Sequence, residues 1–278
     1  MSDCSTCPSN DGCKKDKDKC MIENNPLNNV KNVIGIMSGK GGVGKSSISV
    51  MIAKQLNQLG YKVGILDADI TGPSIPRLLG LTDVKACGTE ECLYPVETED
   101  GIKVMSLNFL IENEDDPVIW RGPVIGNMVK QFWTDVLWED LDYLLIDMPP
   151  GTGDVALTAM QSIPIDGLVM VSVPQDMVSM IVAKAVNMAK KMDINILGII
   201  ENMSYIKCPD CNKKIQLFDG ANTEQFLKEN GLFLLGELPM ISAVSNLSKG
   251  EYSNVGGELW DLFNPAVMNI IKRLAEVK

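Results

Sequence analysis

The stretch from Ser38 to Ser46, which reads SGKGGVGKS, is the feature that most constrains what this chain can fold into. It matches the phosphate-binding pattern G-x-x-x-x-G-K-[ST], with an apolar run at 33–37 before it and a helix-forming segment after it. Its glycines allow a tight turn that points backbone N–H groups inward, and the positive end of the following helix favours an anion. The sequence therefore predicts a phosphate cradle rather than a chance glycine-rich turn, with Lys45 on the β- and γ-phosphates and the Ser46 hydroxyl on Mg²⁺.

Apolar strands and helices alternate along the chain from this loop onward. We expect strands at 33–37, 62–67, 102–107, 143–147, 167–173, 196–202 and 233–238, and helices at 46–59, 123–133, 156–162, 177–192, 223–229 and 259–276. This alternation predicts an α/β fold: a doubly wound, mainly parallel sheet with helices on both faces. We expect residues 31–278 to form this P-loop domain, with a C-x-x-C loop inserted near 205–215, and residues 1–30 to form a separate cysteine-rich, metal-binding tail.

The chain is acidic and contains no histidine, and its formal net charge is −11. Nucleic acid and anionic membranes attract basic surfaces, so we expect neither as a partner. Because the sequence shows no run of about 18 apolar residues and no signal or transit peptide, we expect a cytoplasmic protein. Without histidine, any metal or acid–base site has to consist of thiolates and carboxylates.

Three carboxylates lie at or just after predicted strand ends, where ligands gather in open α/β sheets. Asp67 and Asp147 each close an apolar run, which is typical of a strand that organises Mg²⁺; a helix N-cap is the alternative for each. The segment after Asp147 reads MPPGTGD, a loop able to sense whether a γ-phosphate is present. Asp69 follows two residues after Asp67.

An additional lysine, Lys40, gives the loop the form KGGVGKS. This resembles the deviant P-loop ATPases, which include the nitrogenase iron protein, the Min and Par positioning ATPases, the arsenite-pump ATPase and the Mrp/ApbC-type iron–sulfur carriers. The resemblance implies that Lys40 crosses a dimer interface to the phosphate of the other subunit. It also implies a homodimer that encloses two nucleotides; a solvated surface lysine is the alternative.

The cysteines form two groups with the spacing of metal ligands. Cys4, Cys7, Cys13 and Cys20 are enough to hold one [4Fe–4S] cluster or one Zn²⁺. Cys208 and Cys211 form a C-x-x-C pair, which supplies only half of a four-thiolate site. Either Cys87 and Cys92 complete that site as a zinc ribbon, or two subunits each contribute a pair to a bridging [4Fe–4S] cluster; the expected dimer favours the second arrangement.

The order of the motifs is similar to that of the Mrp/ApbC family of iron–sulfur cluster carrier ATPases. The matching segments are 40–46 (KGGVGKS), 67–74 (DADITGPS), 147–154 (DMPPGTGD) and 201–205 (ENMSY), followed by the C-x-x-C pair. The resemblance implies a protein that binds and slowly hydrolyses ATP, assembles a [4Fe–4S] cluster across a homodimer and transfers it to apo iron–sulfur proteins, with or without a related carrier in a hetero-complex.

The resemblance also assigns roles to individual residues. The expected catalytic residues are Lys40, Lys45 and Asp69, of which Asp69 orients and deprotonates the attacking water. The expected magnesium site consists of Ser46, Asp67 and Asp147. The expected ATP-binding residues are Gly39, Lys40, Gly41, Gly42, Val43, Gly44, Lys45, Ser46, Ser47 and Asn202, where Asn202 reads adenine.

The cysteine-rich N-terminus is similar to the cytosolic nucleotide-binding scaffold branch of that family. That branch has a cysteine well upstream of its C-x₂-C-x₅-C core, whereas here Cys20 has to supply the fourth thiolate. Two other functions remain as alternatives: a positioning or partitioning ATPase, which would need a basic surface, and an ATP-dependent electron-transfer protein, which would use well-separated cysteines. The choice between iron and zinc also stays open.

Overall fold

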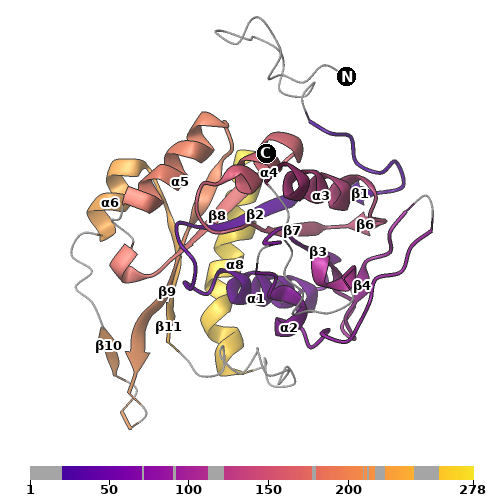
Figure 1. Ribbon diagram of the computed structural model, residues 1–278. Coiled ribbons are helices and arrows are strands. Elements are labelled where there is room, and N and C mark those ends of the chain that lie inside the picture. The colour runs from indigo at the N-terminus through magenta and orange to yellow at the C-terminus, as the bar shows by residue number, and fades with distance from the viewer. Residues whose placement is uncertain are drawn as a thin grey trace, which may run out of the picture.

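The computed structural model describes residues 21–70, 72–89, 92–111, 122–176, 180–208, 210–211, 213–216, 223–240 and 257–278. Within these residues, a nine-stranded sheet has the strand order β10-β9-β8-β2-β7-β3-β5-β4, and β11 also pairs with β9 (Figure 1). Its strands are β2 (Val33–Ser38), β3 (Val63–Asp67), β4 (Val96–Glu97), β5 (Lys103–Met105), β7 (Tyr143–Asp147), β8 (Gly167–Ser172), β9 (Ile196–Lys207), β10 (Lys214–Gln216) and β11 (Leu234–Pro239). A separate two-stranded parallel sheet joins β1 (Asn29–Val30) and β6 (Asp140–Leu141).

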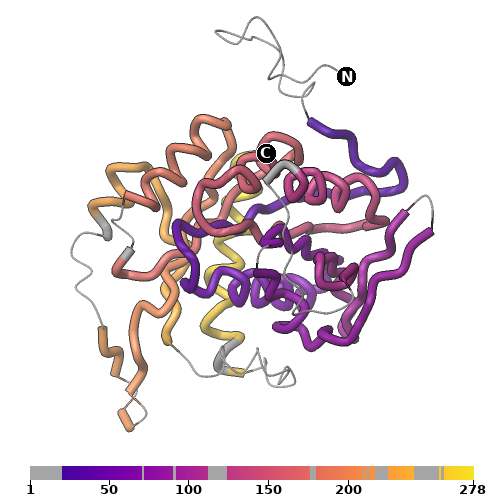
Figure 2. Tube along the Cα trace, viewed as in Figure 1, coloured from indigo at the N-terminus to yellow at the C-terminus, as the bar shows by residue number. Residues whose placement is uncertain are grey.

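Helices cover both faces of the large sheet. They are α1 (Lys45–Gln58), α2 (Ile75–Leu78), α3 (Gly122–Thr134), α4 (Asp154–Ser162), α5 (Met180–Lys191), α6 (Thr223–Asn230) and α8 (Glu258–Val277). Helices α1, α2 and α8 lie on one face, and α3 to α6 lie on the other (Figure 1). Figure 2 follows the chain from the indigo β2–α1 unit to the yellow helix α8, which packs beside α1.

The two hydrophobic cores follow from the period of two in each strand. In β2, Ile34 and Ile36 pack under α1 and α8, whereas Val33 and Met37 pack under the opposite helices. The central strands pair in parallel, and antiparallel pairing occurs at β4–β5 and β9–β10. The α/β fold with a doubly wound, mainly parallel sheet is therefore confirmed. None of the helices in the described ranges is long and apolar enough to cross a membrane.

The position of β2 sets the position of the functional site. This strand lies between β7 and β8, so its carboxyl end is where the chain connections diverge to the two sides of the sheet. In the neighbouring pair β3–β7, Asp67 lies directly opposite Asp147. Three strand ends thus bring the phosphate loop and both predicted acids to one edge.

The structure corrects several predicted boundaries. The strand expected to end at residue 202 continues as β9 to Lys207, because its last three residues pair with β10. The strand expected at 102–107 covers only Lys103–Met105, since a short 3₁₀ helix follows at Leu107–Phe109. Hydrophobic periodicity does not predict the short elements β1, β4, β6, β10 and α2. Each has two to four residues, which is too few for a repeat of apolar positions to be visible.

Part of the expected N-terminal tail contacts the sheet domain. The Ile22 amide donates to the Ser162 carbonyl at 3.0 Å, and the Trp133 indole donates to the Ile22 carbonyl at 3.0 Å. Asn28 also donates to the Val136 carbonyl, and β1 pairs with β6. Residues 22–30 therefore lie against the α/β domain rather than apart from it.

Candidate functional site

The predicted phosphate loop connects the buried strand β2 to helix α1. Gly42 and Gly44 have φ angles of 81° and 84°, a left-handed conformation that glycine adopts without strain. A Cβ atom at Gly42 would meet no atom within 4 Å, whereas one at Gly44 would lie 2.4 Å from Asn202 Nδ2. The loop is therefore open on its outer side and packed against β9 on its inner side.

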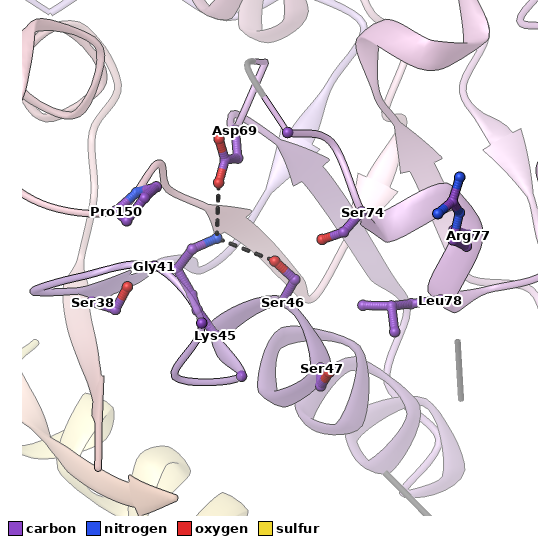
Figure 3. Close-up of a pocket in the computed structure, with 13 residues that line it drawn as sticks. Ser38, Gly41, Lys45, Ser46, Ser47, Asp69, Ser74, Arg77, Leu78 and Pro150 are labelled. Atoms are coloured by element: carbon purple, nitrogen blue, oxygen red, sulfur yellow. Dashed lines mark hydrogen bonds and ion pairs between the residues drawn. The ribbon is translucent and has the colours of Figure 1, made fainter. Parts of the chain in front are cut away.

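Lys45 and Ser46 meet Asp147 at the base of the site. The Lys45 ammonium lies 2.6 Å from Asp147 Oδ2 and 3.9 Å from Asp69 Oδ2. The Ser46 hydroxyl donates to the same Asp147 oxygen at 2.6 Å. Figure 3 shows Lys45 reaching from the loop toward Asp69 on one side and Ser46 on the other. Both Lys45 and Asp147 are buried, and a buried charge is tolerated only with such a partner.

Asp67 occupies a polar position beside this cluster. Its carboxylate accepts hydrogen bonds from the Ser106 hydroxyl at 3.1 Å and from the Asp69 amide at 3.2 Å. Burial raises the pKa of Asp67 to about 8, and the charge of the neighbouring Asp147 adds to the increase, whereas Lys45 opposes it. Asp67 is thus held by groups that follow β3 and β5, whereas Asp147 is held by the end of the phosphate loop and by α1. The role of Asp67 toward Mg²⁺ stays a prediction.

A cavity of about 320 Å³ opens above the phosphate loop (Figure 3). Its lining residues come from the loop, the segment after β3 and the segment after β7: Ser38, Gly41, Gly42, Gly44, Lys45, Ser46, Ser47, Asp69, Gly72, Ser74, Arg77, Leu78 and Pro150. Pro150 is brought close because the Gly151 amide donates to the Ser38 carbonyl at 2.8 Å. The predicted γ-phosphate-sensing segment therefore lies against the phosphate loop.

Ser74 and Arg77 are cavity residues that the sequence argument missed. Both belong to the segment that follows Asp69, at the start of α2 and within it. The available signal was an arginine a few residues beyond a predicted catalytic acid, in a segment already placed at the ligand-binding edge. That arginine adds positive charge to a cavity whose predicted ligand is polyanionic.

The residues at the base of the cavity fit a magnesium nucleotide. Mg²⁺ prefers oxygen ligands and retains several waters, and Ser46 and Asp147 offer a hydroxyl and a carboxylate 2.6 Å apart. The loop supplies backbone N–H groups and the N-terminus of the 14-residue helix α1, which favours phosphate. When bound, Mg²⁺ would neutralise part of the phosphate charge, and Ser46 and Asp147 are the residues that would hold it.

Four of the predicted nucleotide-binding residues lie outside the cavity lining: Gly39, Lys40, Val43 and Asn202. Asn202 is buried in β9, and its amide donates to the Val43 carbonyl at 2.9 Å, so it supports the phosphate loop from below. Its role toward adenine stays a prediction. Lys40 is exposed at the outer side of the loop, and the predicted contact with a second subunit also stays a prediction.

The C-x-x-C pair lies at the tip of the β9–β10 hairpin, which extends from the body of the molecule (Figure 1). The Cys208 amide donates to the Lys213 carbonyl at 3.0 Å and closes the turn. Cys208 is partly exposed and Cys211 is exposed. Hydrogen bonds from the backbone amides of Cys211 and Asp210 lower the pKa of Cys208, which favours the thiolate that a metal requires.

Among the described residues, Cys87 and Cys92 form no metal-binding group with this pair. Cys87 and Cys92 flank a short antiparallel bridge between Gly88 and Leu93, and Cys92 contacts Thr89. No group of three or more Cys, His, Asp or Glu residues in the described ranges could hold a metal ion. The zinc ribbon built from Cys87, Cys92 and the C-x-x-C pair is therefore not formed. Cys4, Cys7, Cys13 and Cys20 lie outside the described residues.

A glycine-rich loop between a central strand and a helix, with acid-terminated strands at the same edge, defines a P-loop nucleotide-binding protein. The chain matches the family described as "ParA: NUBPL iron-transfer P-loop NTPase" over residues 29–275. The chain thus belongs to this family, which confirms the resemblance inferred from its motifs.

Named relatives extend over most of the chain. It is 49% identical over 270 residues to the "Iron-sulfur cluster carrier protein" of Clostridium perfringens, covering 91% of this chain and 95% of the relative. It is 43% identical over 256 residues to the "Cytosolic Fe-S cluster assembly factor Nubp2 homolog" of Drosophila virilis, covering 89% and 95%. A nucleotide-binding protein from Archaeoglobus fulgidus, solved in complex with ADP, superimposes with a TM-score of 0.73 at 41% identity, covering 84% of this chain and 92% of that protein.

Proposed function

We propose that this protein is an ATP-dependent iron–sulfur cluster carrier. It binds ATP with Mg²⁺ in the phosphate-loop cavity, hydrolyses it slowly, and carries a [4Fe–4S] cluster on Cys208 and Cys211 of two chains for delivery to apo iron–sulfur proteins. The observation that carries this proposal is the pairing, on one chain, of a charged phosphate-loop cavity with an exposed C-x-x-C hairpin. The names of the relatives from Clostridium and Drosophila support it.

The nucleotide chemistry is assigned to residues around the cavity. Lys45 would exchange its contact with Asp147 for the phosphates, and Ser46 and Asp147 would hold Mg²⁺. Asp69 lines the cavity and is 3.9 Å from the Lys45 ammonium, a position suited to orienting a water molecule next to the transferring phosphoryl group. Phosphoryl transfer of this kind depends mainly on positioning and electrostatics, which these groups supply.

The cluster chemistry is assigned to a symmetric pair of chains. One C-x-x-C hairpin supplies two thiolates, and a two-fold axis would supply the four that a [4Fe–4S] cluster requires. A cluster held at an exposed hairpin tip is accessible to acceptor proteins. We assign a second cluster to Cys4, Cys7, Cys13 and Cys20, and a hetero-complex with a related carrier would use the same pairing geometry.

The test is the metal content of protein purified without oxygen. Iron, acid-labile sulfide and zinc are measured together with the mass of the assembly, for wild type and for a Cys208→Ser/Cys211→Ser variant. A Cys87→Ser/Cys92→Ser variant is the matched control, because it also removes two accessible thiols.

We expect equal amounts of iron and sulfide in the wild type and in the control. The Cys208→Ser/Cys211→Ser variant should lose the share of both that belongs to the dimer-linked cluster. Zinc in place of iron, or an unchanged iron content in that variant, would contradict the carrier function, because the C-x-x-C pair would then be a structural turn.

A further inference from the structure

The second turn of α1 carries a serine that contacts the predicted magnesium-organising acid. Ser49 is fully buried, and its Oγ lies 2.7 Å from Asp147 Oδ1. Ser46 is three residues earlier on the same helix, so both hydroxyls face the end of β7. Ser46 donates to Asp147 Oδ2 at 2.6 Å. The two serines therefore hold the two oxygens of one carboxylate.

Ser49 also has a second acceptor within reach. Its Oγ lies 3.1 Å from the Lys45 carbonyl, one helical turn earlier. A hydroxyl carries one proton and can serve only one of these acceptors at a time. The contact with Asp147 is shorter, and a charged acceptor strengthens a hydrogen bond, so the carboxylate is the favoured partner.

We propose that Ser49 is a positioning residue for the magnesium site and acts through Asp147. Among the described residues, Ser49 is the side chain that bonds to Oδ1, so its loss would leave that oxygen buried without a partner and the carboxylate free to rotate. Rotation would turn Oδ2 away from Ser46 and Lys45. The inference rests on the proposed function, because it assigns a magnesium nucleotide to this cavity.

The test is a Mg²⁺ titration followed by the fluorescence of bound N-methylanthraniloyl-ADP. Wild type, Ser49→Ala and Ser49→Thr are compared, and the affinity for the same nucleotide is measured separately in EDTA. Ser162→Ala is the matched control, because Ser162 is another buried serine, at the end of α4. Melting temperatures without nucleotide show whether each variant is folded.

We expect Ser49→Ala to raise the Mg²⁺ concentration at half-saturation by about 10-fold, the size typical for loss of a group that orients a metal ligand. Its affinity in EDTA should change by less than about twofold, because no metal is then held. Ser49→Thr keeps the hydroxyl and should return the Mg²⁺ midpoint to within about threefold of wild type, and Ser162→Ala should leave it unchanged.

The proposal would be overturned by a Mg²⁺ midpoint in Ser49→Ala within twofold of wild type. An equal loss of nucleotide affinity with Mg²⁺ and in EDTA would also overturn it, because that pattern would assign Ser49 to helix packing. A threonine variant that melts like wild type but binds Mg²⁺ as poorly as the alanine variant would do the same. Failure of wild type itself to bind the nucleotide would instead overturn the proposed function, so the two failures are distinguishable.

Discussion

The nucleotide cavity and the C-x-x-C hairpin differ in how much of each site one chain builds. At the nucleotide site, contacts of 2.6 Å join Asp147 to Lys45 and Ser46, and both Lys45 and Asp147 are buried. At the hairpin, Cys208 and Cys211 are partly or fully exposed and supply two of the four thiolates that a tetrahedral or cubane site needs.

The difference shows how the two sites would be regulated. A site built within one chain is present whenever the chain is folded, and its occupancy depends on the ligand concentration. A site that needs a second hairpin exists only in the assembly, so its occupancy also depends on the geometry between subunits. Variants that act on one site and spare the other should therefore change nucleotide binding and cluster binding separately.

The largest effect is expected from Lys45→Ala. Removing the ammonium that we assign to the phosphates should lower ATP hydrolysis by more than about 100-fold, because phosphoryl transfer depends on charge stabilisation. Release of inorganic phosphate measures the rate of ATP hydrolysis, and iron content shows whether the C-x-x-C hairpin still holds its cluster. Lys54→Ala is the control, because Lys54 lies on the same helix, is not a lining residue of the cavity and pairs with Asp100 at 3.4 Å. A Lys45→Ala rate within threefold of wild type would contradict the assignment of the cavity.

The second-largest effect is expected from Gly44→Ala, which alters a glycine of the phosphate loop. Gly44→Ala would place a Cβ 2.4 Å from Asn202 Nδ2 at a φ of 84°, whereas Gly60→Ala would meet only the strain of a φ of 90°. Left-handed backbone costs a residue with a Cβ about 1–2 kcal/mol, so Gly60→Ala should lower the free energy of unfolding by that amount. Gly44→Ala should cost more and should also weaken nucleotide binding by about 10-fold, through displacement of the loop.

Denaturant unfolding and nucleotide titration measure both quantities. An Asn202→Ala background removes the clashing amide, so Gly44→Ala should there cost about as much as Gly60→Ala. Equal costs of the two glycine variants in the wild-type background would show that the loop does not depend on its contact with β9.

A smaller effect is expected from Arg77→Ala. Arg77 lines the cavity from α2 and is exposed, so its charge acts on the nucleotide through solvent. The KM for ATP should rise by about threefold, in line with the modest value of exposed charge pairs. Arg273→Ala is the control, because Arg273 pairs with Glu276 at 2.7 Å on α8. An unchanged KM would show that Arg77 of α2 does not contribute to nucleotide binding.

The smallest effect is expected when the hairpin is altered and the cavity is measured. Cys208→Ser/Cys211→Ser should change the affinity for ADP in the metal-free protein by less than about twofold, because the cysteines lie beyond the end of β9 and neither of them is a lining residue of the cavity. Isothermal titration with ADP measures this. A larger change would mean that the two sites are coupled even without a cluster.

The sequence predicted the sheet, the phosphate loop and the strand-end acids because these features are local. Each depends on an apolar period or on residues adjacent in the chain. The sequence pointed to Ser47 and gave no signal for Ser49: Ser47 lines the cavity, whereas Ser49 is buried against Asp147. Only the register of α1 against β7 decides which hydroxyl meets which oxygen. The contribution of Arg77 likewise depends on the short helix α2, which is too brief to give a periodic signal.

The length of β9 limits the insertions and deletions that this part of the chain can accept. Asn202 contacts the phosphate loop and Cys208 follows the same strand six residues later, at about 3.3 Å per residue. Met203, between them, has a φ of 54°, and residues 205–207 pair with β10, so deletion of one residue in this segment would leave both motifs readable but shift the register of the hairpin that carries Cys208. The spacing between the motifs is therefore constrained as strictly as the motifs themselves, and it should tolerate changes of residue type more readily than changes of length.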